Sequence, residues 1–299
     1  MAEKRHPVLI ALLILGFVTL FLGGVMILVM RFSGPPAALS FGPKIGVIPI
    51  QGAILDPEPV LTQLIEFRKE KQIKAIILRI NSPGGGVAPS QEIYREVRRT
   101  RKTKKVIASM GSMAASGGYY VASAADKIVA NPGTLTGSIG VIMEFLNVKE
   151  LLEKFGVGME VIKSGEFKDI GSPHRKLTER EKALLQGLIA EIQEQFVTAV
   201  AEGRGISKKK IREIADGRVL SGEKAKALGL VDALGNFRDA VELAKRECGI
   251  KGEVSLVYPR KPRKKLWEVF LEDTSKLVEQ AIRNAFSSRI EFNRFALSY

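Results

Sequence analysis

The sequence has very few of the side chains that form disulfides, metal sites and histidine-dependent catalytic centres. Its 299 residues include one cysteine, two histidines and one tryptophan. Cys248 alone cannot close an intrachain disulfide, so the fold does not depend on an oxidising compartment. No cluster of cysteine and histidine has the spacing of a zinc site, and we expect no metal and no other cofactor.

Acidic residues are also outnumbered by basic ones, which gives a formal net charge of +14. A strongly basic chain can bind nucleic acid. Here, however, lysine and arginine are scattered along the expected helix faces and mixed with glutamate, and few aromatic residues lie between them. We therefore expect a solvated or membrane-facing surface and no nucleic-acid partner.

One long stretch, Val8 to Met30, is apolar and contains no charged residue. As a helix it would be about 34 Å long, enough to cross a bilayer with some tilt. A cleaved signal peptide has a shorter apolar core and a clear cleavage site, so we expect an anchor at 8–30. Lys4 and Arg5 favour a cytoplasmic N-terminus at 1–7, with the main domain outside the cytoplasm. The expected location is the cell membrane.

After a linker at 31–43, strands alternate with helices, which predicts an α/β domain at 44–258 with a mostly parallel sheet covered on both faces. A basic and amphipathic extension follows at 259–299. The expected strands are 44–50, 73–80, 106–110, 127–130 and 159–163, and the expected helices are 57–71, 87–101 and 147–155. Thr178 and Glu181 form a capping box that predicts the start of a further, long helix.

The domain is organised around residues 111–120, Gly-Ser-Met-Ala-Ala-Ser-Gly-Gly-Tyr-Tyr. An apolar strand precedes them and small, helix-compatible residues follow, which predicts a tight turn with Ser116 where the helix begins. The unpaired N–H groups at a helix start suit a developing oxyanion. The alternative is that Ser116 is an ordinary N-cap.

A second glycine-rich loop, residues 81–86, follows the expected strand 73–80 and reads Asn-Ser-Pro-Gly-Gly-Gly. Such a loop lets backbone N–H groups approach a ligand closely. Two buried strands therefore each end in a glycine-rich loop. In open α/β sheets, ligands bind at this end of the strands.

Four blocks together resemble the short, membrane-anchored signal peptide peptidase A family. They are residues 81–86, 113–120, 136–140 and 164–169, within a resemblance that runs from about Lys44 to Tyr258. The resemblance implies a Clp-like (crotonase-type) fold with a repeated β-β-α core. It implies a serine endopeptidase that degrades hydrophobic peptides, such as cleaved signal peptides, through an acyl-enzyme. It also implies a homo-oligomeric ring, an octamer in the family.

The resemblance assigns Ser116 as nucleophile, Lys168 as general base and Ser138 as the residue that orients the lysine. A lysine base must be neutral, which burial favours. His174 is the remaining candidate base, because His6 precedes the expected anchor. For the oxyanion hole we expect the N–H groups of Gly117 and Gly84, with Gly85 as the alternative to Gly84.

Other interpretations stay open. Ser207 and Ser221 each precede a lysine in an S-x-x-K spacing, Lys210 and Lys224, although both serines stand where a helix N-cap is expected. A crotonase-type acyl-CoA enzyme would use similar glycine loops without a nucleophilic serine. A non-catalytic membrane scaffold of the same fold is a third possibility. For the tail at 287–299, alternating apolar residues suggest docking in a peptide groove, and a frayed end is the alternative.

Overall fold

The computed structural model describes residues 7–33 and 42–259, and the expectations for the C-terminal tail lie outside these residues. The chain divides into two compact units, Met1–Pro43 and Lys44–Tyr299. In the first unit the structure describes the helix α1 (Pro7–Ser33). Among the helices of residues 7–33 and 42–259, none is long and apolar enough to cross a membrane. The anchor at 8–30 stays a prediction.

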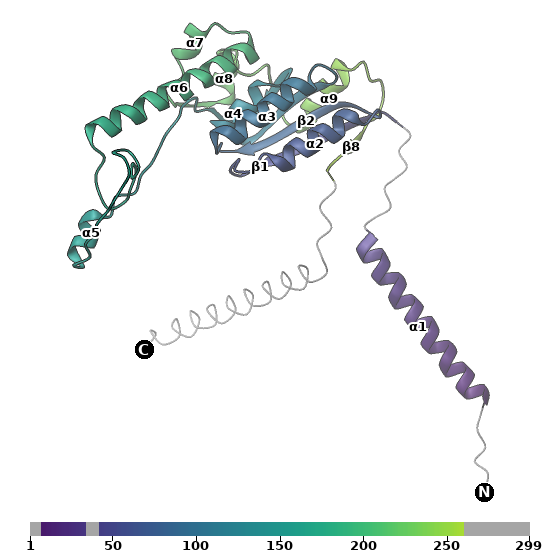
Figure 1. Ribbon diagram of the computed structural model, residues 1–299. Helices are drawn as coiled ribbons and strands as arrows, with labels where there is room; N and C mark the ends of the chain where they lie inside the picture. Colours follow the sequence, from purple (N-terminus) through teal and green to yellow (C-terminus); the bar gives the residue numbers. More distant parts are fainter. Residues whose placement is uncertain (1–6, 34–41, 260–299) are drawn as a thin grey trace, which may run out of the picture. The chain divides into compact units, whose positions relative to one another are not determined.

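The second unit is built on a mostly parallel, eight-stranded sheet with the order β6-β5-β3-β2-β1-β8, in which β4 pairs with β3 and β7 (Figure 1). The strands are β1 (Lys44–Gln51), β2 (Ile73–Ser82), β3 (Lys105–Ala115), β4 (Lys127–Ala130), β5 (Leu135–Gly137), β6 (Val219–Ser221), β7 (Ala233–Leu234) and β8 (Ser255–Val257). Among these strands only β5 and β6 pair antiparallel. The predicted α/β class with a mostly parallel sheet is confirmed.

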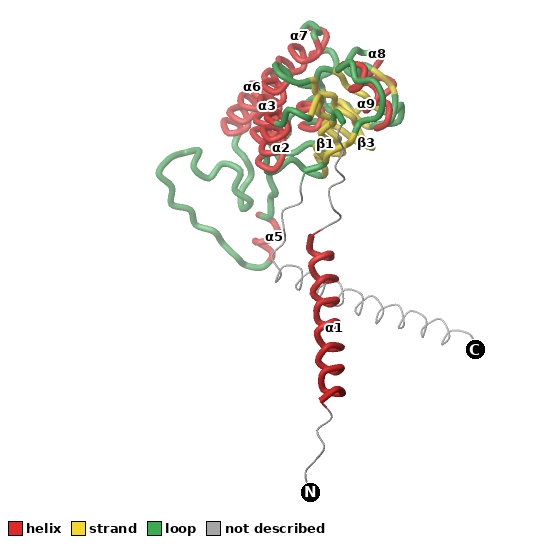
Figure 2. The backbone as a smooth tube through the Cα atoms, turned by 90° about the vertical axis from the view of Figure 1, so that its right-hand side faces the viewer, coloured by secondary structure: helices red, strands yellow, loops and turns green. Residues whose placement is uncertain are grey.

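Helices cover both faces of this sheet because side chains alternate along each strand. Ile76 and Leu78 of β2 belong to the large core, whereas Ala75 and Ile77 belong to a smaller one. The helices that contribute to the large core are α2 (Glu58–Lys69), α3 (Val87–Thr100), α4 (Gly117–Ser123), α6 (Glu179–Arg204), α7 (Lys208–Arg212) and α8 (Gly222–Ala227). On the other face lies α9 (Phe237–Glu247), as the tube in Figure 2 also shows.

The central strands place their carboxyl ends together. β2 and β3 run in register from Ala75 opposite Lys105 to Ile80 opposite Met110, and the register then shifts so that Ser82 lies opposite Ala114. The extra residues of β3 form an irregularity at the carboxyl ends of these two strands, as is common beside active sites. Both glycine-rich loops therefore leave the sheet at the same end, where β2 and β3 finish.

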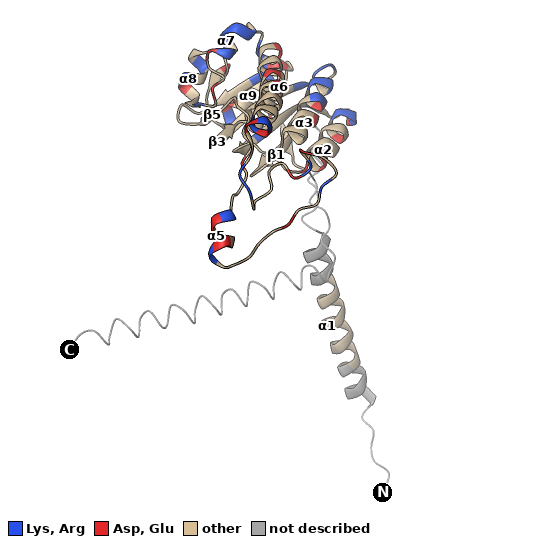
Figure 3. Ribbon diagram, turned by 60° about the vertical axis from the view of Figure 1, so that its left-hand side comes forward, with Lys and Arg blue, Asp and Glu red and all other residues tan. Residues whose placement is uncertain are grey.

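Residues 141–178, called the arm here, extend away from the sheet and its helices (Figures 1 and 3). The arm contains α5 (Lys149–Lys154). Its exposed large apolar residues are Ile142, Phe145, Leu146, Leu151, Phe155, Val157, Met159, Val161, Ile162 and Phe167. The expected strand at 159–163 is wrong, since these residues pair with no described strand. Its apolar alternation was real, but the segment does not reach a sheet edge with which it could pair.

The arm leads into α6, whose predicted capping box is confirmed by the reciprocal bonds of Thr178 and Glu181. The second half of α6 packs on the core through Phe196 and Val200. Its first half does not, and Leu188 there is exposed. The apolar stripe of α6 thus continues beyond the core of its own chain.

Candidate active site

Ser116 lies between the end of β3 and the start of α4, as the sequence predicted. Its φ of 51° is in the region that favours glycine. Within the described residues, Ser116 and Ser138 are the two non-glycine residues with positive φ. Its side chain forms no capping hydrogen bond to α4, so the ordinary N-cap interpretation does not describe this serine. A strained serine at a strand-to-helix turn is typical of a nucleophile held out from the backbone.

Ser138 stands beside this turn because β5 pairs with the end of β3. Ala115 is the register partner of Gly137, and the Ser116 N–H donates to the Gly137 carbonyl oxygen at 2.9 Å. The N–H of Ser138 donates to Arg218 O, also at 2.9 Å. These hydrogen bonds hold both residues in place. The backbone strain of a positive φ costs of order 1–3 kcal/mol per residue.

Gly84 allows the first glycine loop to approach the serine turn. Its φ is +106°, and a Cβ added there would lie 2.7 Å from Gly117 N and 2.8 Å from Ser116 Cβ. A strand-like contact with Ile54 braces this loop, because Ile54 N–H donates to Gly84 O and Gly86 N–H donates to Ile54 O, both at 2.8 Å. Only glycine fits this close approach without displacing the backbone.

The hydrogen bonds of the loop separate the two candidate oxyanion donors. The N–H of Gly84 donates to the buried Ser82 Oγ at 3.1 Å, whereas Gly85 N–H has no acceptor within the described residues. Gly117 N–H likewise has none there. A Cβ on Gly117 would lie 3.3 Å from Gly85 N, so these two groups are near neighbours. The geometry therefore favours Gly85 over Gly84 as the partner of Gly117.

A pocket opens beside these donors. Ser116, Gly85 and Gly117 line one part of it. The rest is largely apolar and is formed by Gly86, Val87, Ser90, Gln91, Tyr120, Gly140, Val141, Ile192 and Phe196. The rings of Tyr120 and Phe196 are 4.8 Å apart, centroid to centroid. An apolar wall next to the candidate nucleophile Ser116 suits an apolar substrate side chain.

Lys168 is not part of this cluster in the single chain. It lies in the arm, in a turn where its N–H donates to Gly165 O at 3.2 Å, and its side chain is exposed. Within the described residues, no hydrogen bond or ion pair joins it to Ser116 or Ser138. The structure thus brings together Ser116, Ser138 and the glycines, and leaves Lys168 on a separate element.

The other catalytic candidates have local partners. His174 Nδ1 lies 2.8 Å from Ser172 Oγ in the arm, away from the Ser116 turn. Ser207 accepts from Lys210 N–H and Ser221 from Lys224 N–H, so both are helix N-caps as predicted. The S-x-x-K spacings are accounted for by these caps.

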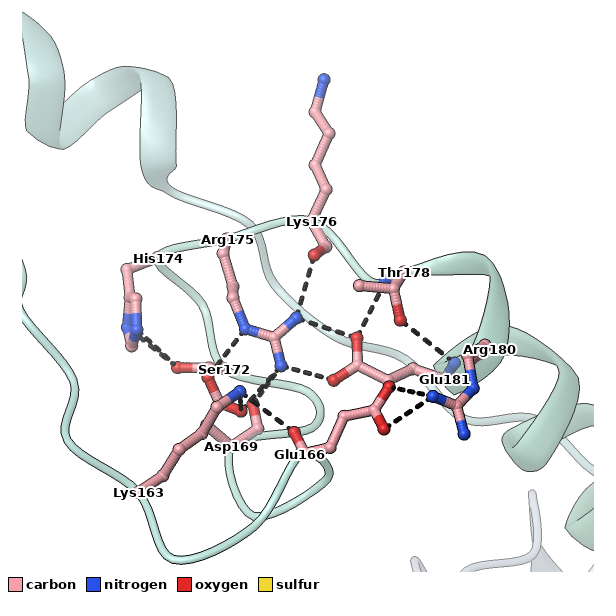
Figure 4. A network of polar contacts seen from close by, with 10 residues as sticks. All are labelled: Lys163, Glu166, Asp169, Ser172, His174, Arg175, Lys176, Thr178, Arg180 and Glu181. Carbon is pink, nitrogen blue, oxygen red and sulfur yellow. Dashed lines mark hydrogen bonds and ion pairs between the residues drawn. The ribbon is translucent and has the colours of Figure 1, made fainter.

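The arm contains a charged network that was not predicted from the sequence and that Figure 4 shows at close range. Arg175 lies between Asp169 and Glu181, and Lys163 also contacts Asp169. Arg175 and Lys163 hold the pKa of the Asp169 carboxyl well below its usual range. Arg175 and the Thr178 N–H lower the pKa of Glu181 to about 2. The sequence signal was weak, because charged residues in a loop are usually solvated.

The amino-acid sequence of this chain is similar to those of known proteins. The model of peptidase family S49 matches residues 98–251, and the Clp protease model matches residues 50–134. A putative protease of Synechocystis is 43% identical over 231 residues, which are 76% of this chain and 83% of the relative. One of Methanocaldococcus jannaschii is 35% identical over 281 residues, 88% of this chain and 89% of the relative.

A third relative, from Enterococcus faecium, is called a putative signal peptide peptidase SppA. It is 42% identical over 188 residues, which are 62% of this chain and 55% of that protein. The family model spans the strand, serine turn and arm described above, and the Clp protease model spans the first glycine loop. The chain belongs to peptidase family S49 and is a serine peptidase of the signal peptide peptidase A type with a Clp protease-like α/β fold.

Proposed function

We propose that this peptidase hydrolyses hydrophobic peptides, such as cleaved signal peptides, through a dyad of Ser116 and Lys168. The observation that carries the proposal is the strained Ser116, which lies beside an apolar pocket and beside the N–H groups of Gly85 and Gly117, neither of which has an acceptor within the described residues. The name of the Enterococcus relative supports signal peptides as substrates.

In the proposed mechanism, Ser116 Oγ attacks the substrate carbonyl carbon while its proton passes to neutral Lys168 Nζ. The N–H groups of Gly85 and Gly117 stabilise the oxyanion of the tetrahedral intermediate. Protonated Lys168 then gives the proton to the leaving amine, and an acyl-enzyme remains. Water attacks the ester, again with Lys168 as base, and releases Ser116. Ser138 orients the lysine amine.

The proposal requires Lys168 to reach a serine turn, and we propose that a neighbouring copy supplies the contact. The exposed apolar residues of the arm and of the first half of α6 support this, because such a surface needs a partner. In a closed ring, an octamer by resemblance, the arm of one copy would lie against the next copy. Burial there would also favour the neutral amine.

We further propose that residues 8–30 anchor the protein in the cell membrane, with the peptidase domain outside the cytoplasm. The support is the uncharged apolar sequence and the basic residues before it. Reconstitution of the full chain and protease protection of its two ends would test the orientation. Digestion of the peptidase domain from the cytoplasmic side only would contradict it.

The experiment on the dyad uses full-length Ser116→Ala and Lys168→Ala proteins, separately and co-expressed. Each alone should lack peptidase activity and should fail to react with a serine-directed acylating probe. Co-assembly should restore part of the activity if the dyad forms between copies. No restoration would place the dyad within one chain. Full activity of Lys168→Ala would overturn the dyad itself.

A further inference from the structure

We propose that Arg175 is a positioning residue for Lys168, because its guanidinium fixes the turn that carries Lys168 and compensates the charge of the adjacent Asp169. The inference rests on the proposed role of Lys168 as general base. The sequence alone left a difficulty at this place. A carboxylate directly after the base would favour the charged lysine, unless it is turned toward other cations.

The structure shows where that carboxylate is directed. Arg175 Nε donates to Asp169 Oδ2 at 2.7 Å, and Arg175 Nη2 donates to Oδ1 at 2.8 Å. Lys163 Nζ donates to the same Oδ1 at 2.6 Å. Both carboxylate oxygens of Asp169 therefore face cations of the arm (Figure 4). A two-pronged arginine contact of this kind also fixes orientation.

Arg175 connects this turn to the start of α6. Its Nη1 donates to Glu181 Oε2 at 2.8 Å, and Glu181 Oε2 also accepts from the Thr178 N–H at 2.8 Å. The Glu181 side chain is only 1% exposed, so it is a fixed point for the guanidinium. A buried carboxylate of this kind depends on its cationic partner. The Lys168 turn is thus tied to the first turn of α6 rather than to another loop.

The same arginine also holds the backbone next to Lys168. Arg175 Nη2 donates to the Asp169 carbonyl oxygen at 3.3 Å, and Ser172 N–H donates to that oxygen at 3.0 Å. On the other side, Lys168 N–H donates to Gly165 O. Lys168 therefore stands in a turn whose following residue is fixed through both side chain and main chain. Such support is what a base presented to another surface requires.

The surrounding charges leave the network balanced. Arg180 pairs with Glu166 and lies over the Phe167 ring, and Lys176 pairs with Glu150 of α5. His174 is held by Ser172. Loss of Arg175 would leave Asp169 paired with Lys163 alone and Glu181 without a guanidinium. The added negative charge would then favour the ammonium form of Lys168.

The first measurement is the pH dependence of Lys168 acetylation in full-length Ser116→Ala protein, with acetic anhydride pulses and mass spectrometry. Arg175→Met should move the labelling midpoint upward by about one pH unit, the size expected for one nearby charge. Arg175→Lys, which keeps the charge, should move it much less. Lys182→Met is the matched control. It removes one cation near the start of α6, but Lys182 pairs with Glu179 and not with Asp169 or Glu181.

The second measurement is the pH profile of kcat/KM in proteins with Ser116 intact. Activity requires the neutral base, so Arg175→Met should shift the rising limb to higher pH and lower activity about tenfold on that limb. Arg175→Lys should keep the limb but lower kcat through the looser turn. A general loss of activity without a shift of the limb in Arg175→Met would overturn the electrostatic part of the inference.

Asp169→Asn provides the decisive cross-check. If Arg175 acts by compensating Asp169, then Arg175→Met in the Asp169→Asn background should cause little further shift of the labelling midpoint. An equal shift in both backgrounds, or none in either, overturns the inference. This readout also remains available if Arg175→Met lowers stability. Activity in Lys168→Ala would instead overturn the proposed function, and the labelling distinguishes the two failures.

Discussion

The Ser116 N–H donates to the carbonyl oxygen of Gly137 at 2.9 Å, so the strained Ser116 turn is fixed by the residue directly before Ser138. Ser116 and Ser138 thus share one short piece of sheet, the pairing of β3 with β5. Their unusual φ values follow from that pairing and from the Arg218 carbonyl that accepts from Ser138. A change in either strand would move both serines.

Replacement of the dyad residues tests the assignment of the nucleophile and base. Ser116→Ala and Lys168→Ala should each abolish peptide hydrolysis and leave the thermal melt unchanged within error, because neither side chain makes a hydrogen bond or ion pair within the described residues. The double variant should be no worse than either single one, since dyad members act as a unit. An active Lys168→Ala with an inactive His174→Ala would instead make His174 the base.

The close approach of Gly84 predicts a severe effect of one methyl group. Gly84→Ala should displace the neighbouring donor Gly117 N–H and lower kcat by about 100-fold, the size of the loss of one oxyanion donor, and it should also lower Tm. The physical reason is the 2.7 Å contact that the new Cβ would make with Gly117 N. Gly133→Ala is the control, because a Cβ there meets nothing within 4 Å. Wild-type kinetics in Gly84→Ala would contradict the described loop.

Ser82 predicts a separate effect on stability. Ser82→Ala leaves the buried Gly84 N–H without its acceptor and should cost about 1–3 kcal/mol of unfolding free energy. Chemical denaturation measures this difference. Ser112→Ala, at an exposed serine of β3, should change the unfolding free energy by far less. Equal values for the two variants would show that Ser82 does not support the loop.

The lowered pKa of Glu181 predicts an acid-dependent contribution to stability. A carboxyl with a folded pKa of about 2 stabilises the fold above its unfolded pKa of about 4.3, and this contribution is lost as pH falls toward 2. The Tm difference between wild type and Glu181→Gln should therefore shrink as pH falls through this window. A difference that is constant across the window would mean that Arg175 does not pair with an ionised Glu181.

The arm predicts an oligomer interface. Ile162 is 95% exposed in the single chain, so Ile162→Asp should weaken the assembly by placing a charge in the proposed contact. Analytical ultracentrifugation of the full chain in detergent should show a smaller species and lower activity. Tyr258→Asp, at an exposed aromatic residue outside the arm, serves as the control. An unchanged sedimentation profile for Ile162→Asp would remove the arm from the interface.

The sequence predicted local structure well where one residue pattern had one physical solution. The apolar runs of β1, β2 and β3 indicated core strands, and the capping box at Thr178 and Glu181 located the start of α6. The alternation at 159–163 failed as a strand, because pairing depends on a neighbouring edge that periodicity cannot supply. The same limit applies to the first half of α6, whose apolar face finds no cover on its own core.

The sequence by itself determined the fold class, the family and the place of Ser116 at a strand-to-helix turn. These depend on local patterns and on motifs in fixed order. Only the tertiary structure decided that the Gly84 N–H donates to Ser82 Oγ, while the Gly85 N–H has no acceptor within the described residues. It also decided that the Asp169 carboxylate faces Arg175 and Lys163. Hydrogen-bond direction and charge pairing depend on which groups the folded chain brings within about 3 Å, and spacing along a sequence does not contain that information.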